Sequence, residues 1–280
     1  MDAWKSRWGV GQWAAYCENQ ALPVMHRSKL LMTQLEAAEG ERLAPKELAD
    51  VVLQDPLLCL CLLRESERRK SHRLAHETTT ALTAIMQLGV DEFRKLLLTS
   101  PEVDEANAGL QAVEARARMA AQIARTWATG RADLNPEEIA VAALLAGAGD
   151  LLLWVYAEEI PRKAEATLRA GHAQRSAQAQ IHACGFTFKE LTLQCAERWK
   201  LPALVLQLLR GAETQRAQLT RTCSNAARHV LDESPTATLA LASDLLEAVR
   251  LVPNASVEWL ADGLPLGEDR RREVLAAVAK

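Results

Sequence analysis

The chain has 280 residues, enough for one large domain or two small ones, and its net charge of -3 excludes the global basic field typical of nucleic-acid or anionic-membrane binding. Hydrophobic residues make up 49% of the chain but aromatic residues only 4%, which favours packed helices over sheets. The first twenty residues hold no apolar signal segment, and no uncharged stretch reaches the ~18 residues of a membrane span. With six cysteines predicted to be reduced thiols, we expect a soluble cytoplasmic protein.

The N-terminal segment, residues 1–19, is marked by tryptophans. Trp4 and Trp8 lie one helical turn apart, and Trp13 follows shortly after. Large aromatic side chains contribute strongly to packing wherever they are buried. We therefore predict that this segment anchors the N-terminus in the core, with a docking site for a partner as the alternative.

Helix starts are predicted wherever a capping side chain precedes proline. Proline suits the first helical position, because the N–H that it lacks would be unpaired there, and the preceding side chain can accept hydrogen bonds from the first turn. Three starts have both features, at Asp55-Pro56, Asn135-Pro136 and Ser234-Pro235. Ser100-Pro101 is a further candidate start, whereas Ala44-Pro45 and Leu201-Pro202 offer only the proline.

The apolar pattern between these starts predicts an all-α, multi-helix bundle. Leucine and alanine recur at helical spacing, and no stretch alternates as a strand would. The breaks predict a helical domain over residues 20–215, made of groups 20–100 and 105–215, and a helical extension over 216–280. The side chains expected in the core are Leu57, Leu58, Leu62, Leu144, Leu145, Leu152 and Trp199.

No catalytic or metal-binding motif stands out. His72 and His76 are spaced as two ligands on one helix face, but only Glu77 offers a third ligand nearby, so a solvated pair is the better interpretation. Cys59 and Cys61 lie in a leucine-rich run and are predicted to be small buried hydrophobes rather than a redox pair. We expect no metal and no cofactor.

The densest positive charge lies between residues 64 and 73. Its five cations are Arg64, Arg68, Arg69, Lys70 and Arg73. Guanidinium groups can hold phosphate or carboxylate through two parallel hydrogen bonds. This basic stretch is therefore the candidate site for an anion or an acidic partner, with an ordinary solvated surface as the alternative.

The order of several motifs resembles the HDOD domain, a bacterial signalling module related to the HD phosphohydrolases. Six pieces carry the resemblance over residues 20–212. They are Leu22-Pro23-Val24, the stretch from Glu47 to Leu57, Leu62-Leu63-Arg64, the stretch from Ala84 to Leu96 with its Gly89 turn, the stretch from Pro136 to Leu145, and the stretch from Gly185 to Pro202. The resemblance implies an HD-related helical fold.

The chain departs from the related hydrolases where their metal ligands would stand. The signature LLHDIGK is replaced by residues 144–150, LLAGAGD, so that Ala146 and Gly147 stand in place of histidine and aspartate. Further histidines would fall near Ala112–Val113, Phe188 and Gly211–Ala212, and none is present. Metal-assisted hydrolysis requires fixed ligands.

The resemblance and its departures together predict a non-catalytic signalling adaptor that binds a protein partner. The partner would use a groove between the helical groups or the C-terminal helices. One alternative is a sensor of a nucleotide or cyclic dinucleotide without turnover, holding phosphate through the basic stretch or through Arg210 and Arg216. The other alternative is a metal-dependent phosphohydrolase with unrecognised ligands. No nucleic acid or membrane is expected as a partner, and the oligomeric state stays open.

Overall fold

The computed structural model describes residues 7–39, 43–70, 77–211, 213–232 and 234–279. The chain forms two compact units, one of Met1–Glu114 with Leu145–Leu206 and one of Ala115–Leu144 with Gln207–Lys280. Apart from the isolated bridge between Val24 and Glu102, the regular structure of the described residues is helical, as predicted.

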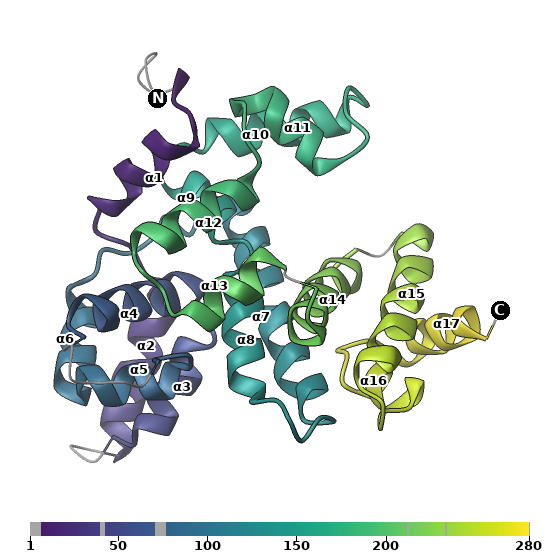
Figure 1. Ribbon diagram of the computed structural model, residues 1–280, viewed down its shortest axis with the longest axis horizontal. Helices are drawn as coiled ribbons and strands as arrows, with labels where there is room; N and C mark the ends of the chain where they lie inside the picture. Colours follow the sequence, from purple (N-terminus) through teal and green to yellow (C-terminus); the bar gives the residue numbers. More distant parts are fainter. Residues whose placement is uncertain (1–6, 40–42, 71–76, 212, 233, 280) are drawn as a thin grey trace. The chain divides into compact units, whose positions relative to one another are not determined.

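The first unit is built from two neighbouring groups of helices (Figure 1). The first group is α2 (His26–Glu39), α3 (Pro45–Val52), α4 (Pro56–Arg68), α5 (Ala81–Leu88) and α6 (Val90–Thr99). The second is α1 (Val10–Glu18), α9 (Ala148–Tyr156), α10 (Glu159–Arg169), α11 (Ser176–Cys184) and α12 (Phe188–Arg198). Helix α4 packs against α3, α5 and α6 of its own group and against α9 of the other, and α12 packs against both α1 and α9.

Helix α4 has this central place because its first half is apolar on every side. Residues 56–63 are all buried, as a helix must be when hydrophobic side chains surround it. The predicted cap is present, since Asp55 accepts hydrogen bonds from the backbone N–H groups of Leu57 and Leu58 at 2.9 and 3.0 Å. Cys59 and Cys61 are buried within the helix, as predicted.

Two of the N-terminal tryptophans, Trp8 and Trp13, lie in the described part of the chain and pack against other aromatic rings. Trp13 is fully buried, and its ring lies 5.0 Å from that of Trp8 and 5.9 Å from that of Tyr16 between centroids. Tyr16 in turn contacts Tyr156 of α9, at 5.8 Å. The prediction of a buried N-terminal anchor is confirmed for Trp13, and Trp4 lies outside the described residues.

One predicted helix start is wrong. Ser100-Pro101 begins no helix, and the chain stays non-helical until α7 begins at Ala108. Instead, Val24 donates its N–H to Pro101 O at 2.8 Å and accepts from Val103 N at 3.1 Å. This pairing satisfies the backbone in an extended conformation, so the local helix signal is overridden by a partner from the α1–α2 connection.

The second unit is arranged around α15 (Pro235–Leu251), which packs against α14 (Gln215–Val230), α16 (Val257–Asp262) and α17 (Glu268–Val278). Three further helices contribute residues to both units: α7 (Ala108–Ala128), α8 (Pro136–Leu145) and α13 (Ala203–Arg210). Arg270 of α17 donates to three carbonyl oxygens at the end of α14, those of His229, Val230 and Asp232. Because the last carbonyls of a helix have no partner within it, Arg270 stabilises the end of α14.

One described stretch, Pro136–Tyr156, is long and apolar enough to cross a membrane by composition alone. The core helices of a globular protein pass the same test, and 72% of its most apolar window is buried. This stretch is therefore weak evidence for a membrane span.

The side chains expected in the core are all buried, and Leu145 is 0% exposed. We expect Leu145→Ala to lower the free energy of unfolding by ~2–5 kcal/mol, since the substitution removes buried methyl groups and leaves a cavity. Urea unfolding followed by circular dichroism measures this loss. A matched substitution at the 61% exposed Leu239 should cost less than ~0.5 kcal/mol. Equal losses for the two variants would contradict the burial of Leu145.

Candidate functional site

The described part of the basic stretch, residues 64–70, lies at the C-terminal end of α4, and its cations contact other groups of the chain. Arg64 donates from Nη1 to Gln20 O at 3.1 Å, and its guanidinium lies 5.6 Å from the centroid of the Trp199 ring. Arg64 thereby joins the end of α4 to the α1–α2 connection and to the end of α12. This role is structural and differs from that of a solvated anion ligand.

The other described cations of the basic stretch are paired with carboxylates. Arg69 contacts Glu65 at 2.7 Å and Glu92 at 2.8 Å, and these hydrogen bonds raise the pKa of its guanidinium. Lys70 lies 3.2 Å from a Glu67 oxygen, while Arg68, with its side chain 71% exposed, lies 3.6 Å from Glu65. Arg73, His72 and His76 lie outside the described residues. An anion would have to compete with these carboxylates, and its binding here stays a prediction.

Most of the positions where the resemblance places metal ligands lie together near the start of α9. Gly147 is the cap of α9, and a Cβ atom built on it would lie 3.9 Å from Val113 of α7. Two residues later, Gly149 lies against the first turn of α12, which begins at Phe188. The fold therefore brings these positions together, with glycine and apolar side chains in the places of ligands. Gly211 belongs to the other unit, and Ala212 lies outside the described residues.

The approach of α9 to α12 is close enough to require a glycine. A Cβ atom at Gly149 would lie 2.2 Å from Phe188 O and 2.8 Å from Thr192 N, both backbone atoms. The Gly149 N–H donates to Thr192 Oγ1 at 2.8 Å, and that hydroxyl donates to Phe188 O at 3.1 Å. The glycine of the LLHDIG-like signature is thus explained by packing, independently of any metal.

The buried carboxylate next to these positions is already paired. Glu114 of α7 is 3% exposed and lies 3.2 Å from Arg27 Nη1, and Arg27 Nη2 also donates to Gln54 O at 2.7 Å. His172 and His182 are both exposed. Among the described residues, no group of three or more His, Cys, Asp or Glu side chains is placed to hold a metal ion.

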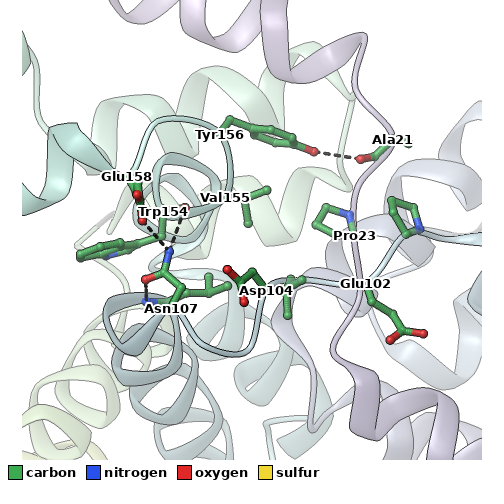
Figure 2. Close-up of a pocket in the computed structure, with 12 residues that line it drawn as sticks. Ala21, Pro23, Glu102, Asp104, Asn107, Trp154, Val155, Tyr156 and Glu158 are labelled. Carbon is green, nitrogen blue, oxygen red and sulfur yellow. Dashed lines mark hydrogen bonds between the residues drawn. The ribbon is translucent and has the colours of Figure 1, made fainter. Parts of the chain in front are cut away.

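A cavity of about 390 Å³ opens where three connections of the first unit meet (Figure 2). The connections are those between α1 and α2, between α6 and α7, and between α9 and α10. Its lining is Ala21, Pro23, Pro101, Glu102, Val103, Asp104, Asn107, Leu110, Trp154, Val155, Tyr156 and Glu158. A volume of several hundred Å³ is typical of a binding site, and the lining here mixes polar and apolar side chains about equally.

Hydrogen bonds hold the walls of this cavity in place. Tyr156 donates its hydroxyl to Ala21 O at 2.9 Å, and burial raises the pKa of this phenol, which stays a donor. Asn107 caps α7 by accepting from Leu110 N at 3.2 Å, and its amide donates to Trp154 O at 3.3 Å. These bonds join all three connections around the cavity.

The Trp154 ring packs against the backbone of α7. A Cβ atom at Gly109 would lie 2.1–2.4 Å from its ring atoms, so only glycine leaves room for the ring there. Leu57, Leu110, Val113 and Leu151 complete the buried cluster around it. The wall of the cavity is therefore continuous with the core.

Sequence reasoning missed this cavity. The available signal was the pair of acidic residues Glu102 and Asp104 between α6 and α7, which directly follows the Ser100-Pro101 pair that predicts a helix start. The contribution of Trp154 and Glu158 to the same space depends on packing between distant segments.

The comparisons with known proteins come from a family model and from solved structures. The model of the HDOD domain matches residues 24–214. The chain is similar in structure to a virulence factor from Campylobacter jejuni subsp. jejuni, with a TM-score of 0.74 and 16% identity, covering 95% of this chain and 97% of that one. It is also similar to the MmoQ response regulator from Methylococcus capsulatus str. Bath, with a TM-score of 0.66 and 21% identity, covering 89% and 99%.

At such identities the solved structures show a shared fold. No protein with a curated description matches the chain. The family model spans well over half of the 280 residues and takes in the start of α9, the α9–α12 contact and most of the cavity lining. The chain belongs to the HDOD domain family.

Proposed function

We propose that this protein is a non-catalytic signalling adaptor of the bacterial cytoplasm that acts by binding a protein partner. Membership of the HDOD family supports a role related to signalling, and one structural neighbour is described as a response regulator. Function depends on the site rather than on the fold, so the adaptor role needs an argument from particular residues.

The observation that carries the proposal is the chemistry at the start of α9. A phosphohydrolase needs side chains that fix a metal ion and lower the pKa of its bound water. The side chains at the corresponding positions are those of Ala146, Val113 and Phe188, with Gly147 offering none. The carboxylate of Glu114, which follows Val113 in α7, is paired with Arg27. A protein with this arrangement can still present its surface to a partner.

The test compares turnover, ligand binding and partner capture on the full chain. With Mn²⁺ added, we expect no hydrolysis of bis(p-nitrophenyl) phosphate or of a cyclic dinucleotide above the buffer rate. Elemental analysis of the purified protein should find far less than about one Fe, Mn or Zn per chain. Crosslinked capture from the native lysate should enrich one protein reproducibly.

Each alternative gives a different outcome. Turnover together with about one or two metal ions per chain, lost on replacing His172 or His182 by alanine, would establish an enzyme and contradict the proposal. Nucleotide-dependent stabilisation against melting, without turnover, would establish a sensor. Replacing both Arg68 and Arg69 by glutamate then tests whether the basic stretch holds the phosphate, with Arg210→Glu as the matched variant elsewhere.

A further inference from the structure

Two buried cysteines lie in the helices α1 and α12 of the first unit. Helix α1 packs against α12, and the side chains that α1 buries are those of Trp13, Ala14 and Cys17. Cys195 is among the side chains that α12 buries. Each of the two cysteines is 1% exposed. The contact between these helices therefore holds a thiol on each side, from segments far apart in the sequence.

Two observations place the cysteines at the same level of this contact. Glu18, the residue after Cys17, lies 3.6 Å from Arg198 between Oε2 and Nη1, and Arg198 is about one helical turn beyond Cys195 on α12. The neighbouring thiol of Cys17 raises the pKa of the Cys195 thiol, and burial raises it further. Cys195 is thus turned toward α1, and the two sulfur atoms are close neighbours.

The spacing of packed helices suits a disulfide at such a position. The axes of helices in contact lie ~8–10 Å apart and each Cα atom lies ~2.3 Å from its axis, so Cα atoms that face each other are about 4–6 Å apart. A disulfide joins Cα atoms ~4.4–6.8 Å apart. The small buried side chains of Ala14 and Ala196, beside the two cysteines, favour the closer approach of the helices.

Burial keeps these thiols from reacting while α1 is in place. The thiolate is the reactive form, and the raised pKa keeps Cys195 protonated. Helix α1 has only nine residues, so its stability depends on its packing, and local opening would expose both sulfur atoms. The buried Nε1 of Trp13 has no hydrogen-bond partner among the described residues, which reduces the stability gained by burying α1. Opening of α1 thus controls access to the pair.

We propose that Cys17 and Cys195 form a peroxide-sensitive pair whose oxidation to a disulfide fixes α1 on α12. When α1 opens, one thiolate attacks a peroxide oxygen, the O–O bond breaks, and a sulfenic acid and water are formed. The second thiol attacks that sulfur, the S–O bond breaks, and a second water leaves as the disulfide forms. Two thiols and one hydrogen peroxide give one disulfide and two waters, and a dithiol reductant reverses the change. This inference is independent of the proposed adaptor function.

The test treats the full chain in native buffer with a small excess of hydrogen peroxide. The remaining thiols are then blocked with N-ethylmaleimide in urea, and a non-reduced digest is mapped by mass spectrometry. The number of free thiols should fall from six to four, with Cys17 and Cys195 in one linked peptide that dithiothreitol releases. Chymotrypsin should cleave after Tyr16 at least about tenfold more slowly in the oxidised protein, because the disulfide opposes the opening of α1.

Cys17→Ala and Cys195→Ala should each abolish both the link and the protection. The matched control is Cys223→Ala, which removes a fully buried thiol from α14 of the second unit and should change neither. Retention of all six thiols, oxidation of the half-buried Cys184 alone, or a link that forms only after unfolding in urea would overturn the proposal. A link that leaves cleavage after Tyr16 unchanged would also overturn it. The map of the unmutated protein decides the matter even if an alanine variant fails to fold.

Discussion

Replacing Gly149 by alanine should lower the free energy of unfolding by about 3 kcal/mol or more. The new Cβ atom would lie 2.2 Å from the carbonyl oxygen of Phe188 and 2.8 Å from the backbone nitrogen of Thr192. Backbone atoms cannot move aside as a flexible side chain can, so α9 and α12 would have to separate. That movement would also break the hydrogen bond from Gly149 N to Thr192 Oγ1. Urea unfolding followed by circular dichroism measures the effect.

Gly147→Ala is the matched control for this prediction. Gly147 lies two residues earlier in the same motif, has a φ of -100° that alanine tolerates, and has its nearest neighbour at 3.9 Å. Its replacement should cost less than about 1 kcal/mol, mainly through the weaker cap. If the two variants lose equal stability, the close approach of α9 to α12 is not the reason for Gly149.

The second large effect is expected at Asp55, where alanine should cost ~3–5 kcal/mol. Its carboxylate is fully buried and accepts four hydrogen bonds, from the backbone of Met25, Leu57 and Leu58 and from the hydroxyl of Ser28. Burial raises the pKa of this carboxyl group, and the hydrogen bonds from Leu58, Met25 and Ser28 oppose that rise. Without the carboxylate, all four donors would lose their partner, and the α1–α2 connection would lose one of its attachments to α4.

Two variants make the prediction for Asp55 specific. Asp55→Asn keeps one oxygen for the helix cap but directs an N–H₂ group at other donors, so an intermediate loss is expected. Ser234→Ala removes a cap before proline whose hydroxyl accepts from Ala237 N at 3.2 Å and shares a hydrogen bond with the exposed Thr236 Oγ1 at 3.0 Å, and it should cost only ~1 kcal/mol. A loss at Asp55 no larger than that at Ser234 would show that the long-range bonds contribute nothing. Both variants are measured by urea unfolding.

The all-α fold and most of its helix starts were predictable, because the physical causes are local. A cap followed by proline acts within one turn, and it correctly predicted the starts of α4, α8 and α15. Burial of the leucines in α4 and α8 was also predictable from the sequence, because a helix that is apolar on all sides is expected to be buried in the core. The failure at Ser100-Pro101 shows the limit of such signals. The extended segment there is held by Val24, 77 residues away in the numbering, through backbone hydrogen bonds that leave no trace in side-chain composition.

For the candidate site, too, some features were predictable from the sequence and others depend on the tertiary structure. The sequence by itself determined which side chains stand at the start of α9, because the absence of histidine and aspartate at Ala146 and Gly147 needs no coordinates to be seen. Only the tertiary structure decided which charges remain for a partner. It paired Arg64 and Arg69 of the basic stretch with groups of the chain, and it brought Asp104 and Trp154 to one cavity from segments far apart. The reason is that the sequence shows which charged residues are present, but not which of them are paired within the chain. That pairing depends on residues far away in the sequence, which packing brings into contact.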